Sequence, residues 1–323
     1  MRNYRWAILG AGHIAEKFSE SLKVCQQAEL YAVASRSLDK AENFRKDFGF
    51  KKAYGSYEEM LADPSVDIVY IATPNNLHFE HTMMSLNAGK AVLCEKPFGL
   101  NKSQVDQMIR KAQEKKLFLM EALWSRFLPS ILKVKKEIEA GRIGTPKVLQ
   151  AEFGFKAEYN ENSRLFNPSL GGGSVFDIGI YPLFLSLYLF GYPTEIKAIS
   201  IPAPTGTDMT TSMLLKHKNG EISNLTSSFA LRMETDARIY GEKGYLKLHR
   251  MFHMPTKLVC KIGDEDETEL PIHWVGNGYN YEALEVMKCL DEGLTESREL
   301  PFSFSEDLIS LIDKVNDLIK NNI

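Results

Sequence analysis

A glycine-rich turn near the amino end places the strongest constraint on how this chain can fold. Residues 10–15 read Gly-Ala-Gly-His-Ile-Ala, directly after the apolar run 6–9 and directly before apolar residues with helical spacing. In that position the first glycine permits a tight turn, the second lets a pyrophosphate approach the backbone, and the small last residue permits close helix–strand packing. The turn predicts a dinucleotide-binding βαβ unit. We expect cofactor contacts, through the backbone at position 13, from Gly10, Gly12, His13 and Ile14.

The first part of the chain alternates between short apolar runs and amphipathic helical patterns. The apolar runs are 6–9, 29–34, 66–72, 91–94 and 117–120. Continuous runs of this length are typical of strands buried on both faces of a parallel sheet. Helical patterns such as 77–88 and 103–115 lie between them, and this alternation favours right-handed βαβ units. We therefore predict an N-terminal Rossmann domain, a doubly wound parallel sheet of the α/β class, over residues 1–122.

The pattern changes after that domain. Alternating segments such as 147–155, 209–217, 221–229 and 245–249 predict strands, and Asn219-Gly220 is a hairpin signal. Helices are predicted at 129–140, 174–190, 281–291 and 305–320. We expect a C-terminal α+β domain over residues 123–323, built on a large, mostly antiparallel, open-faced sheet.

Composition excludes several kinds of partner. The chain has 323 residues, and 39 Lys and Arg against 42 Asp and Glu give a formal net charge of −3. This balance lacks the long-range attraction of nucleic-acid and anionic-membrane binders, so we expect neither partner. The most apolar stretch, 180–190, is shorter than a bilayer span, and no signal-peptide pattern follows the N-terminus. A cytoplasmic protein is expected. The four cysteines are too far apart in sequence to indicate a metal site, so none is expected.

The end of the second apolar run indicates which dinucleotide binds. NAD-binding domains usually carry Asp or Glu there, which bonds the ribose hydroxyls. Here the chain reads Ala34-Ser35-Arg36-Ser37 instead. A guanidinium offers a planar fork for a 2′-phosphate, and hydroxyl groups add donors. We expect NADP rather than NAD, held by Ser35, Arg36 and Lys40, although a solvated loop arginine would give the same sequence.

Three further motifs place polar side chains where a ligand can bind. They are residues 73–78 (Thr-Pro-Asn-Asn-Leu-His), residues 95–97 (Glu-Lys-Pro) and residues 177–181 (Asp-Ile-Gly-Ile-Tyr). The first two follow the third and fourth apolar runs, and ligands of open α/β sheets bind beyond the carboxyl ends of the strands. We expect cofactor contacts from Thr73, Pro74, Asn75, His78, Glu95 and Lys96, although His78 could equally cap its helix.

These motifs resemble the Gfo/Idh/MocA oxidoreductases, and the resemblance covers almost the whole chain. The usual later motif of that family is Asp-x-Gly-x-His, whereas this chain has Tyr181 at the histidine position. That change, with Leu-Cys-Glu-Lys-Pro at 93–97 and Gly-Gly-Gly-Ser-Val-Phe-Asp at 171–177, resembles one branch, the dimeric dihydrodiol dehydrogenases and NADP-dependent D-xylose dehydrogenases. The resemblance implies a homodimer formed through the C-terminal sheet and a cis peptide bond before Pro97.

The chemistry of an alcohol dehydrogenase agrees with these residues. Hydride removal from a carbinol carbon needs a base for the hydroxyl proton, and a nearby ammonium lowers the pKa of a tyrosine toward the useful range. We predict that Tyr181 takes the proton and that Lys96 lowers the pKa of Tyr181. Asp177, four residues before Tyr181, is predicted to position Lys96 or the substrate. Each has a structural alternative: a core tyrosine, a solvated lysine, and an aspartate that only serves a helix N-terminus.

Aromatic and cationic residues near the motifs are weaker candidates for substrate contact. They are Trp124, Arg126 and Phe153, each of which could equally belong to the core or to an ion pair. The predicted function is NADP-dependent hydride transfer on a cyclic polyol, a pyranose sugar such as D-xylose or a trans-dihydrodiol. The alternatives are an inositol or amino-sugar type dehydrogenase or reductase of the same family, and a non-catalytic NADP or sugar sensor.

Overall fold

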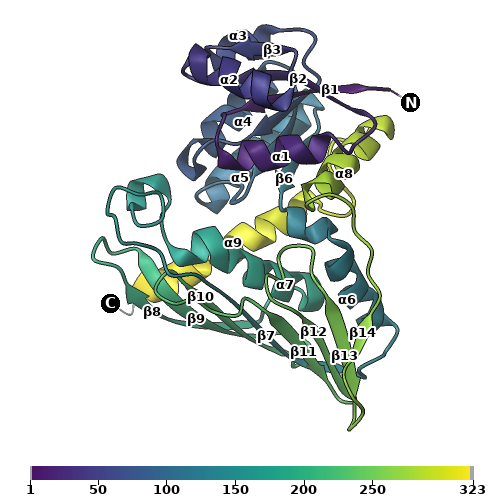
Figure 1. Cartoon of the computed structure of the whole chain (residues 1–323). Helices are drawn as coiled ribbons and strands as arrows, with labels where there is room; N and C mark the ends of the chain where they lie inside the picture. The colour runs from purple at the N-terminus through teal and green to yellow at the C-terminus, as the bar shows by residue number, and fades with distance from the viewer. Residues whose placement is uncertain (1, 321–323) are drawn as a thin grey trace. The chain divides into compact units, whose positions relative to one another are not determined.

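The computed structural model describes residues 2–320 and divides the chain into two compact units (Figure 1). Unit 1 comprises Met1–Trp124 and Val275–Glu306, and unit 2 comprises Ser125–Trp274 and Asp307–Ile323. This division differs from the expected contiguous domains 1–122 and 123–323, because a late segment of the chain returns to the first unit.

Unit 1 contains a parallel sheet in the order β3-β2-β1-β4-β5-β6. Its strands are β1 (Tyr4–Leu9), β2 (Ala28–Ala34), β3 (Lys52–Tyr54), β4 (Ile68–Ile71), β5 (Ala91–Glu95) and β6 (Leu119–Ala122). Every residue of β4, β5 and β6 is buried, as expected of strands covered on both faces. The order reverses between β1 and β4, which is the switch point where ligands of this architecture bind. The predicted Rossmann sheet is confirmed, although the short edge strand β3 lacks an apolar run and was not predicted.

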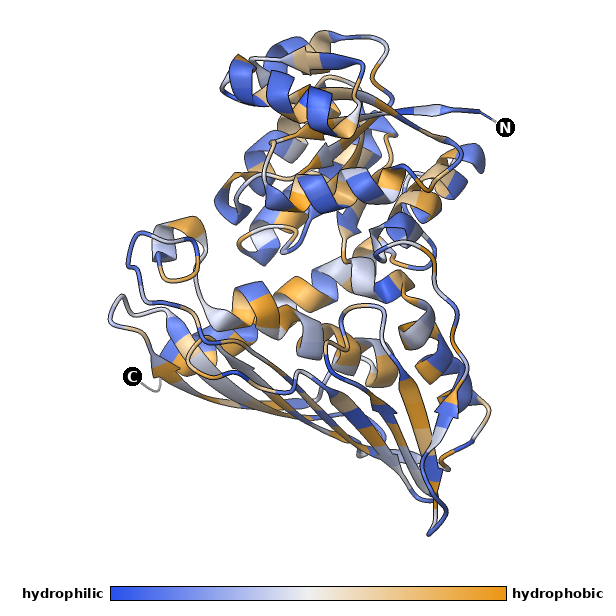
Figure 2. Ribbon diagram, in the orientation of Figure 1, coloured by the Kyte–Doolittle hydropathy of each residue, from blue (hydrophilic) through white to orange (hydrophobic). Residues whose placement is uncertain are grey.

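Helices accompany these strands, and three of them begin with a side-chain cap. They are α1 (His13–Leu22), α2 (Leu38–Phe48), α3 (Tyr57–Ala62), the short η1 (Asn75–Leu77), α4 (His78–Asn87), α5 (Lys102–Lys115) and α8 (Tyr279–Asp291). Ser37, Ser56 and Asn101 cap α2, α3 and α5 by accepting backbone N–H bonds. Figure 2 shows hydrophilic residues on the outer turns of these helices.

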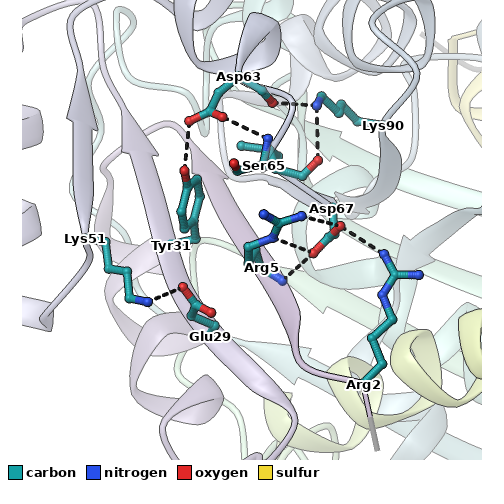
Figure 3. Close-up of polar contacts among 10 residues, drawn as sticks. Arg2, Arg5, Glu29, Tyr31, Lys51, Asp63, Ser65, Asp67 and Lys90 are labelled. Atoms are coloured by element: carbon teal, nitrogen blue, oxygen red, sulfur yellow. Dashed lines mark hydrogen bonds and ion pairs between the residues drawn. The ribbon is translucent and has the colours of Figure 1, made fainter.

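The amino ends of the parallel strands are joined by ion pairs and hydrogen bonds (Figure 3). Asp67, just before β4, accepts hydrogen bonds from the backbone N and the Nε of Arg5 at 2.9 and 3.0 Å, from a terminal guanidinium nitrogen of Arg5 at 3.2 Å and from Arg2 at 3.0 Å. Lys90, just before β5, is buried and donates to the carbonyl oxygens of Asp63 and Val66 at 2.7 and 3.1 Å. These contacts tie neighbouring strands together at the end opposite to the glycine-rich turn.

The returning segment around α8 belongs to unit 1 because it packs against α1 and the sheet edge. Asn277 donates to the backbone oxygen of Lys17 at 3.0 Å. The Leu119 amide of the edge strand β6 donates to the Thr295 oxygen at 3.1 Å. Contacts of such large sequence separation explain why no local pattern placed this segment.

Unit 2 contains an eight-stranded sheet in the order β14-β13-β12-β11-β7-β10-β9-β8. Its strands are β7 (Pro146–Gly154), β8 (Glu195–Pro202), β9 (Asp208–Lys216), β10 (Ile222–Ser228), β11 (Ala237–Gly241), β12 (Gly244–Leu248), β13 (Leu258–Ile262) and β14 (Thr268–Leu270). Neighbouring strands are antiparallel except β7 and β10, which run parallel. The mostly antiparallel sheet is therefore confirmed, with β8 as an additional strand.

Helices cover one face of this sheet (Figure 1). They are α6 (Pro129–Glu139), α7 (Ile180–Phe190) and the later part of α9 (Phe302–Lys320), and the short turns η2 (Trp124–Phe127), η3 (Pro168–Leu170) and η4 (Val175–Gly179) accompany them. The predicted helix 174–190 is divided, because η4 is a π-helical turn that precedes α7. By length and composition alone, Pro168–Phe190 could cross a membrane, and 89% of its most apolar window is buried inside the protein.

Candidate active site

The glycine-rich turn has the geometry of a phosphate-binding loop. Gly10 has φ +105°, and a Cβ there would lie 2.9 Å from the Thr73 side chain and 3.1 Å from the Ala72 oxygen. Gly12 is the N-cap residue of α1 and supplies no side-chain cap, unlike the polar residues that cap α2, α3 and α5. The N–H groups at the start of α1 therefore suit a bound pyrophosphate. The imidazole Nδ1 of His13 lies 3.1 Å from the Glu16 carboxylate. The side chain is therefore engaged, and His13 contributes its backbone to the glycine-rich turn.

The segment after β2 presents cations and hydroxyls to solvent. Ser35 is buried, and its hydroxyl accepts from the Ser37 amide at 3.4 Å. Ser37 in turn accepts from the Lys40 amide at 3.3 Å. Arg36 and Lys40 are exposed, and burial lowers the pKa of His81, with the nearby Arg36 charge lowering it further. A guanidinium at this place, with no carboxylate at the end of β2, fits a 2′-phosphate.

The loop after β4 is fixed by two histidines. The Thr73 hydroxyl and the His81 Nδ1 lie 2.9 Å apart. The ring of His78 is buried between two backbone carbonyls, with Nδ1 2.8 Å from the Pro97 oxygen and Nε2 2.9 Å from the Thr73 oxygen. Burial lowers the pKa of His78 to about 4, so its ring is neutral near pH 7. The side chain of His78 thus joins the 73–78 loop to the 95–97 turn, while Pro74 and Asn75 begin η1.

The turn after β5 presents Lys96. The peptide bond between Lys96 and Pro97 is cis, which confirms the expectation drawn from the family resemblance. Glu95 is buried, accepts a short hydrogen bond from the Tyr70 hydroxyl, and accepts from the Lys96 amide at 3.2 Å. Lys96 itself is half-buried. The structure therefore places the Glu95 side chain in the interior, where it fixes the turn that carries Lys96.

Two further buried carboxyl groups lie in this part of unit 1, and the sequence motifs did not include them. Glu121 accepts from the Phe98 amide at 3.2 Å and from the Ser305 hydroxyl at 2.7 Å, and burial raises its pKa to about 7. Burial, together with the charge of Glu95, raises the pKa of Glu282 well above its ordinary value. A glutamate inside an apolar strand run, as at Met120-Glu121-Ala122, is the sequence signal that could have indicated this cluster.

Unit 2 supplies Asp177 and Tyr181. Asp177 lies in the π-helical turn η4 and accepts from the Arg164 guanidinium at 2.8 Å. Burial opposes protonation of Arg164, yet its pKa is raised by the Asp177 carboxylate and also by Tyr181. Both predicted residues therefore lie near one guanidinium, on the same side of the helix. Arg164 belongs to a loop with no recognisable motif, and the sequence did not identify it.

Aromatic rings surround Tyr181. Its ring centroid lies 5.7 Å from that of Phe153 and 4.7 Å from that of His253, and the Phe153 and His253 rings stack at 4.3 Å. Tyr181, Phe153 and His253 are all buried. Phe153 is thus next to the predicted base, and His253 is a neighbour that no sequence pattern indicated.

The other two weaker candidates for substrate contact, Trp124 and Arg126, pack against aromatic rings of the protein. The Trp124 ring stacks on Tyr279 at 4.0 Å with an interplanar angle of 7°. The Arg126 guanidinium lies over the Tyr188 ring at 4.3 Å. Both candidates are buried, so each contributes packing in its own unit. Within residues 2–320, no group of three His, Cys, Asp or Glu side chains could hold a metal ion.

The Rossmann sheet, its uncapped first helix and the polar turns after β4 and β5 define a dinucleotide-dependent oxidoreductase. Residues 4–123 match the model of an oxidoreductase family with an NAD-binding Rossmann fold, and residues 131–247 match the Gfo/Idh/MocA C-terminal domain. The chain belongs to the Gfo/Idh/MocA family of oxidoreductases.

Similar proteins span nearly the whole chain. The trans-1,2-dihydrobenzene-1,2-diol dehydrogenase of Mus musculus is 38% identical over 98% of this chain and 96% of the relative, and that of Homo sapiens is 36% identical over the same shares. Among solved structures, the aldose-aldose oxidoreductase of Caulobacter crescentus has a TM-score of 0.91 at 23% identity and covers 100% of this chain and 99% of that one. The 3-ketoreductase KijD10 of Actinomadura kijaniata, solved with NADP and TDP-benzene, has a TM-score of 0.90 at 25% identity, with 98% of each chain covered.

Proposed function

We propose that this oxidoreductase transfers hydride between NADP and a cyclic polyol, either a pyranose sugar such as D-xylose or a trans-diol on a six-membered ring. The observation that carries the proposal is the surroundings of Tyr181. Its buried ring lies among the Phe153 and His253 rings, while Asp177 and Arg164 provide polar groups nearby. Apolar ring faces with a few placed polar groups suit a saturated ring that carries hydroxyls.

Each catalytic group has a defined task in the proposal. Tyr181 takes the proton of the reacting hydroxyl, or returns it in the reductive direction. Lys96 carries the positive charge that favours the phenolate and orients the hydroxyl. Asp177 holds Arg164 at 2.8 Å and so positions polar groups beside the substrate. The bound nicotinamide supplies the hydride acceptor or donor.

The preference for NADP rests on the segment after β2. Arg36 and Lys40 are both exposed there, and the chain has Ser35 where an NAD-binding domain usually has a carboxylate. The substrate class rests on the diol dehydrogenases that are 34–38% identical to this chain. A trans-diol and a pyranose share neighbouring hydroxyls on a six-membered ring, so one pocket can accept either.

The test is turnover followed by absorbance of the reduced cofactor. Purified protein is offered NADP or NAD with D-xylose, D-glucose, myo-inositol or trans-1,2-cyclohexanediol. We expect turnover with NADP and the pyranoses or the diol, and much weaker turnover with NAD. Preference for myo-inositol, or for NAD, would contradict the proposal.

Two variants with matched controls test the residue roles. Tyr181→Phe should lower kcat by about 10²- to 10⁴-fold, because the proton acceptor is lost, while Tyr188→Phe on the same helix should not. Arg36→Ala should raise the KM for NADP by about 10-fold or more and leave the KM for NAD unchanged, because it removes charge-assisted bonds to phosphate. Arg45→Ala is its control, since Arg45 pairs with Glu42 on α2 at 2.8 Å.

We also propose a homodimer formed through the outer face of the unit 2 sheet. Large apolar side chains stand exposed on that face, with Ile199 76% and Ile201 60% exposed on β8, and Leu214 and Ile222 exposed on β9 and β10. Exposed and buried residues alternate along β9 and β10, so the opposite face of these strands is buried. Light scattering should give a dimer, and Ile199→Asp with Ile201→Asp should give a monomer. A wild-type monomer at micromolar concentration would contradict this.

A further inference from the structure

The first residues of β9 contact both segments that carry the reactive groups of unit 2. Asp208 Oδ2 accepts hydrogen bonds from the Ser174 hydroxyl at 2.6 Å, the Val175 amide at 2.7 Å and the Thr211 hydroxyl at 3.3 Å. Ser174 and Val175 begin the π-helical turn that contains Asp177 and leads into Tyr181. One carboxylate oxygen therefore holds the start of that turn.

Thr207, the residue before β9, contacts the loop that carries Arg164. The Thr207 hydroxyl donates to the Phe166 oxygen at 3.4 Å, next to Arg164 and Leu165. The glycine triplet completes the connection, because the Gly173 amide donates to the Leu165 oxygen at 2.9 Å and the Gly172 amide donates to the Asn167 oxygen at 3.0 Å. The loop with Arg164 and the turn with Asp177 are thus bonded to each other and to the beginning of β9.

Packing leaves this arrangement little freedom. Gly173 has φ +129°, and a Cβ there would collide with Asp208 Oδ1. A Cβ at Gly172 would lie 2.8 Å from the Asn167 oxygen. Ser174, Thr211 and Ser227 are fully buried, and the Ser174 and Ser227 hydroxyls lie 2.9 Å apart. The Asp208 carboxylate is thus enclosed by groups that either donate to it or touch it.

We propose that Asp208 is a positioning residue for the reaction, which holds the turn before Tyr181 in the orientation that catalysis needs. This inference rests on the proposed role of Tyr181. Asp208 touches no reacting atom in this proposal and acts through Ser174 and Val175. A π-helical turn is a frequent feature of functional sites and needs support from outside the helix, since its own hydrogen bonds are less regular.

The surroundings of Asp208 also give its function a pH dependence. Burial raises its pKa to about 6, against the hydrogen bonds from Ser174, Val175 and Thr211, which favour the charged form. The groups that bond to it or to its partners from η4, β9 and β10 are uncharged, and Asp177 of η4 pairs with Arg164 of the facing loop. Protonation removes the negative charge that strengthens the three hydrogen bonds to Oδ2, so the turn loosens below pH about 6.

Two substitutions at Asp208 separate positioning from fold. Asp208→Leu keeps the branching at Cγ but has no acceptor, and it should lower kcat by about 10- to 100-fold with little change in the Kd of NADP. Asp208→Asn keeps one acceptor oxygen and carries no charge at any pH, as protonated Asp208 does, so its kcat should lie between those of wild type and Asp208→Leu and should not decline below pH about 6, because an amide does not titrate. Full kcat in Asp208→Leu, or a retained acid decline in Asp208→Asn, would overturn the proposal.

Controls distinguish this inference from the proposed function. Asp236 pairs with Lys247 at 3.4 Å in the same sheet, so Asp236→Leu should leave kcat unchanged. If Asp208→Leu does not fold, Ser174→Ala removes the shortest of the three hydrogen bonds and should lower kcat severalfold. Hydrogen–deuterium exchange of residues 163–185 needs no substrate. After correction for the intrinsic effect of pH, exchange of these amides should become faster in wild type below pH about 6. In Asp208→Leu or Ser174→Ala it should be faster than in wild type at every pH above that value. Exchange equal to that of wild type in the variant would refute the inference even if no polyol is turned over.

Discussion

The acidic residues at the two ends of the parallel sheet in unit 1 have opposite environments. At the amino ends of the strands, Asp63 and Asp67 are charged and receive hydrogen bonds from several donors. At the carboxyl ends, Glu95, Glu121 and Glu282 are buried close to one another and to Lys96. The carboxylates at the amino ends of the strands therefore stabilise the fold. The buried carboxyl groups at the carboxyl ends destabilise the fold and lie near Lys96, a proposed catalytic residue.

Hydrogen bonds dominate at the amino ends. Burial opposes ionisation of Asp63, yet bonds from Lys52 at 2.8 Å, Tyr54 at 2.6 Å and the Ser65 amide at 2.8 Å hold its pKa well below the ordinary value. The Arg5 side chain lowers the pKa of Asp67 in the same way, against burial. These carboxylates stabilise the fold at any pH above their ordinary pKa.

Burial dominates at the carboxyl ends. Neither carboxyl oxygen of the fully buried Glu282 has a hydrogen-bond partner among residues 2–320. Burial and the charge of Glu95 also raise the pKa of Tyr70 well above its ordinary value. Groups with raised pKa values gather where a cleft performs chemistry more often than where a fold is merely held together. The difference predicts that substitutions at the carboxyl ends mainly change kcat, whereas substitutions at the amino ends mainly change the free energy of unfolding.

The largest expected effect comes from the two lysines that flank β5. Lys96→Met, at the carboxyl end, should lower kcat by about 10²- to 10⁴-fold, because the ammonium that tunes the base is lost, and should leave the midpoint of thermal unfolding nearly unchanged. The measurement is steady-state kinetics beside calorimetry. Lys90→Met, at the amino end of the same strand, is the matched control for kcat. Equal loss of kcat in both variants would remove the contrast.

A second prediction concerns Glu282 and the dependence of stability on pH. Its pKa is raised on folding, so its favourable contribution is complete below the pKa of the unfolded state and is lost as pH rises toward the folded value. Wild type should lose stability relative to Glu282→Gln as pH rises above about 5, with a slope of at most about 1.4 kcal/mol per pH unit, the limit for one proton. Urea unfolding at several pH values measures this. Glu292→Gln, exposed after the same helix, should show no such divergence.

The third prediction concerns the free energy of unfolding at the amino end. Lys90→Met should lower it by about 2 kcal/mol, because two buried carbonyl oxygens lose their donor. Unfolding in urea measures the change, and kcat serves as the second readout. Unchanged stability, or a loss of kcat at equal cofactor binding, would contradict the assignment of this end to stability.

The smallest effect is expected for Asp63→Asn. The amide has one acceptor oxygen, whereas Asp63 uses one oxygen for Tyr31, Tyr54 and Lys52 and the other for the Ser65 amide. We expect a loss of about 1 kcal/mol near pH 7. The folded pKa is lowered, so the loss should begin to shrink as pH falls below about 4, where the unfolded aspartate becomes protonated, and should vanish only when the folded carboxyl is protonated as well. A loss that is equal at all pH values would mean that packing, not charge, is responsible.

Short-range features of the sequence predicted candidate residues in both units. The glycine turn at Gly10 and the four-residue spacing of Asp177 and Tyr181 each depend on a few neighbouring residues, whereas the cis peptide bond before Pro97 was expected from the family resemblance. The π-helical turn is the limit of that reasoning. Helical periodicity predicts one helix over 174–190, whereas the structure has a π-helical first turn, whose start donates two hydrogen bonds to Asp208.

Local sequence by itself determined most of the strands and helices and the dinucleotide-binding turn, because backbone geometry and burial patterns act over a few residues. Tertiary structure alone decided that Val275–Glu306 returns to unit 1, that Glu282 is buried near Glu95, and that Arg164, His253 and Asp208 surround the Asp177–Tyr181 segment. These contacts join residues that are distant in sequence. Their partners are selected by the burial and hydrogen bonding of the whole fold, which no local pattern records.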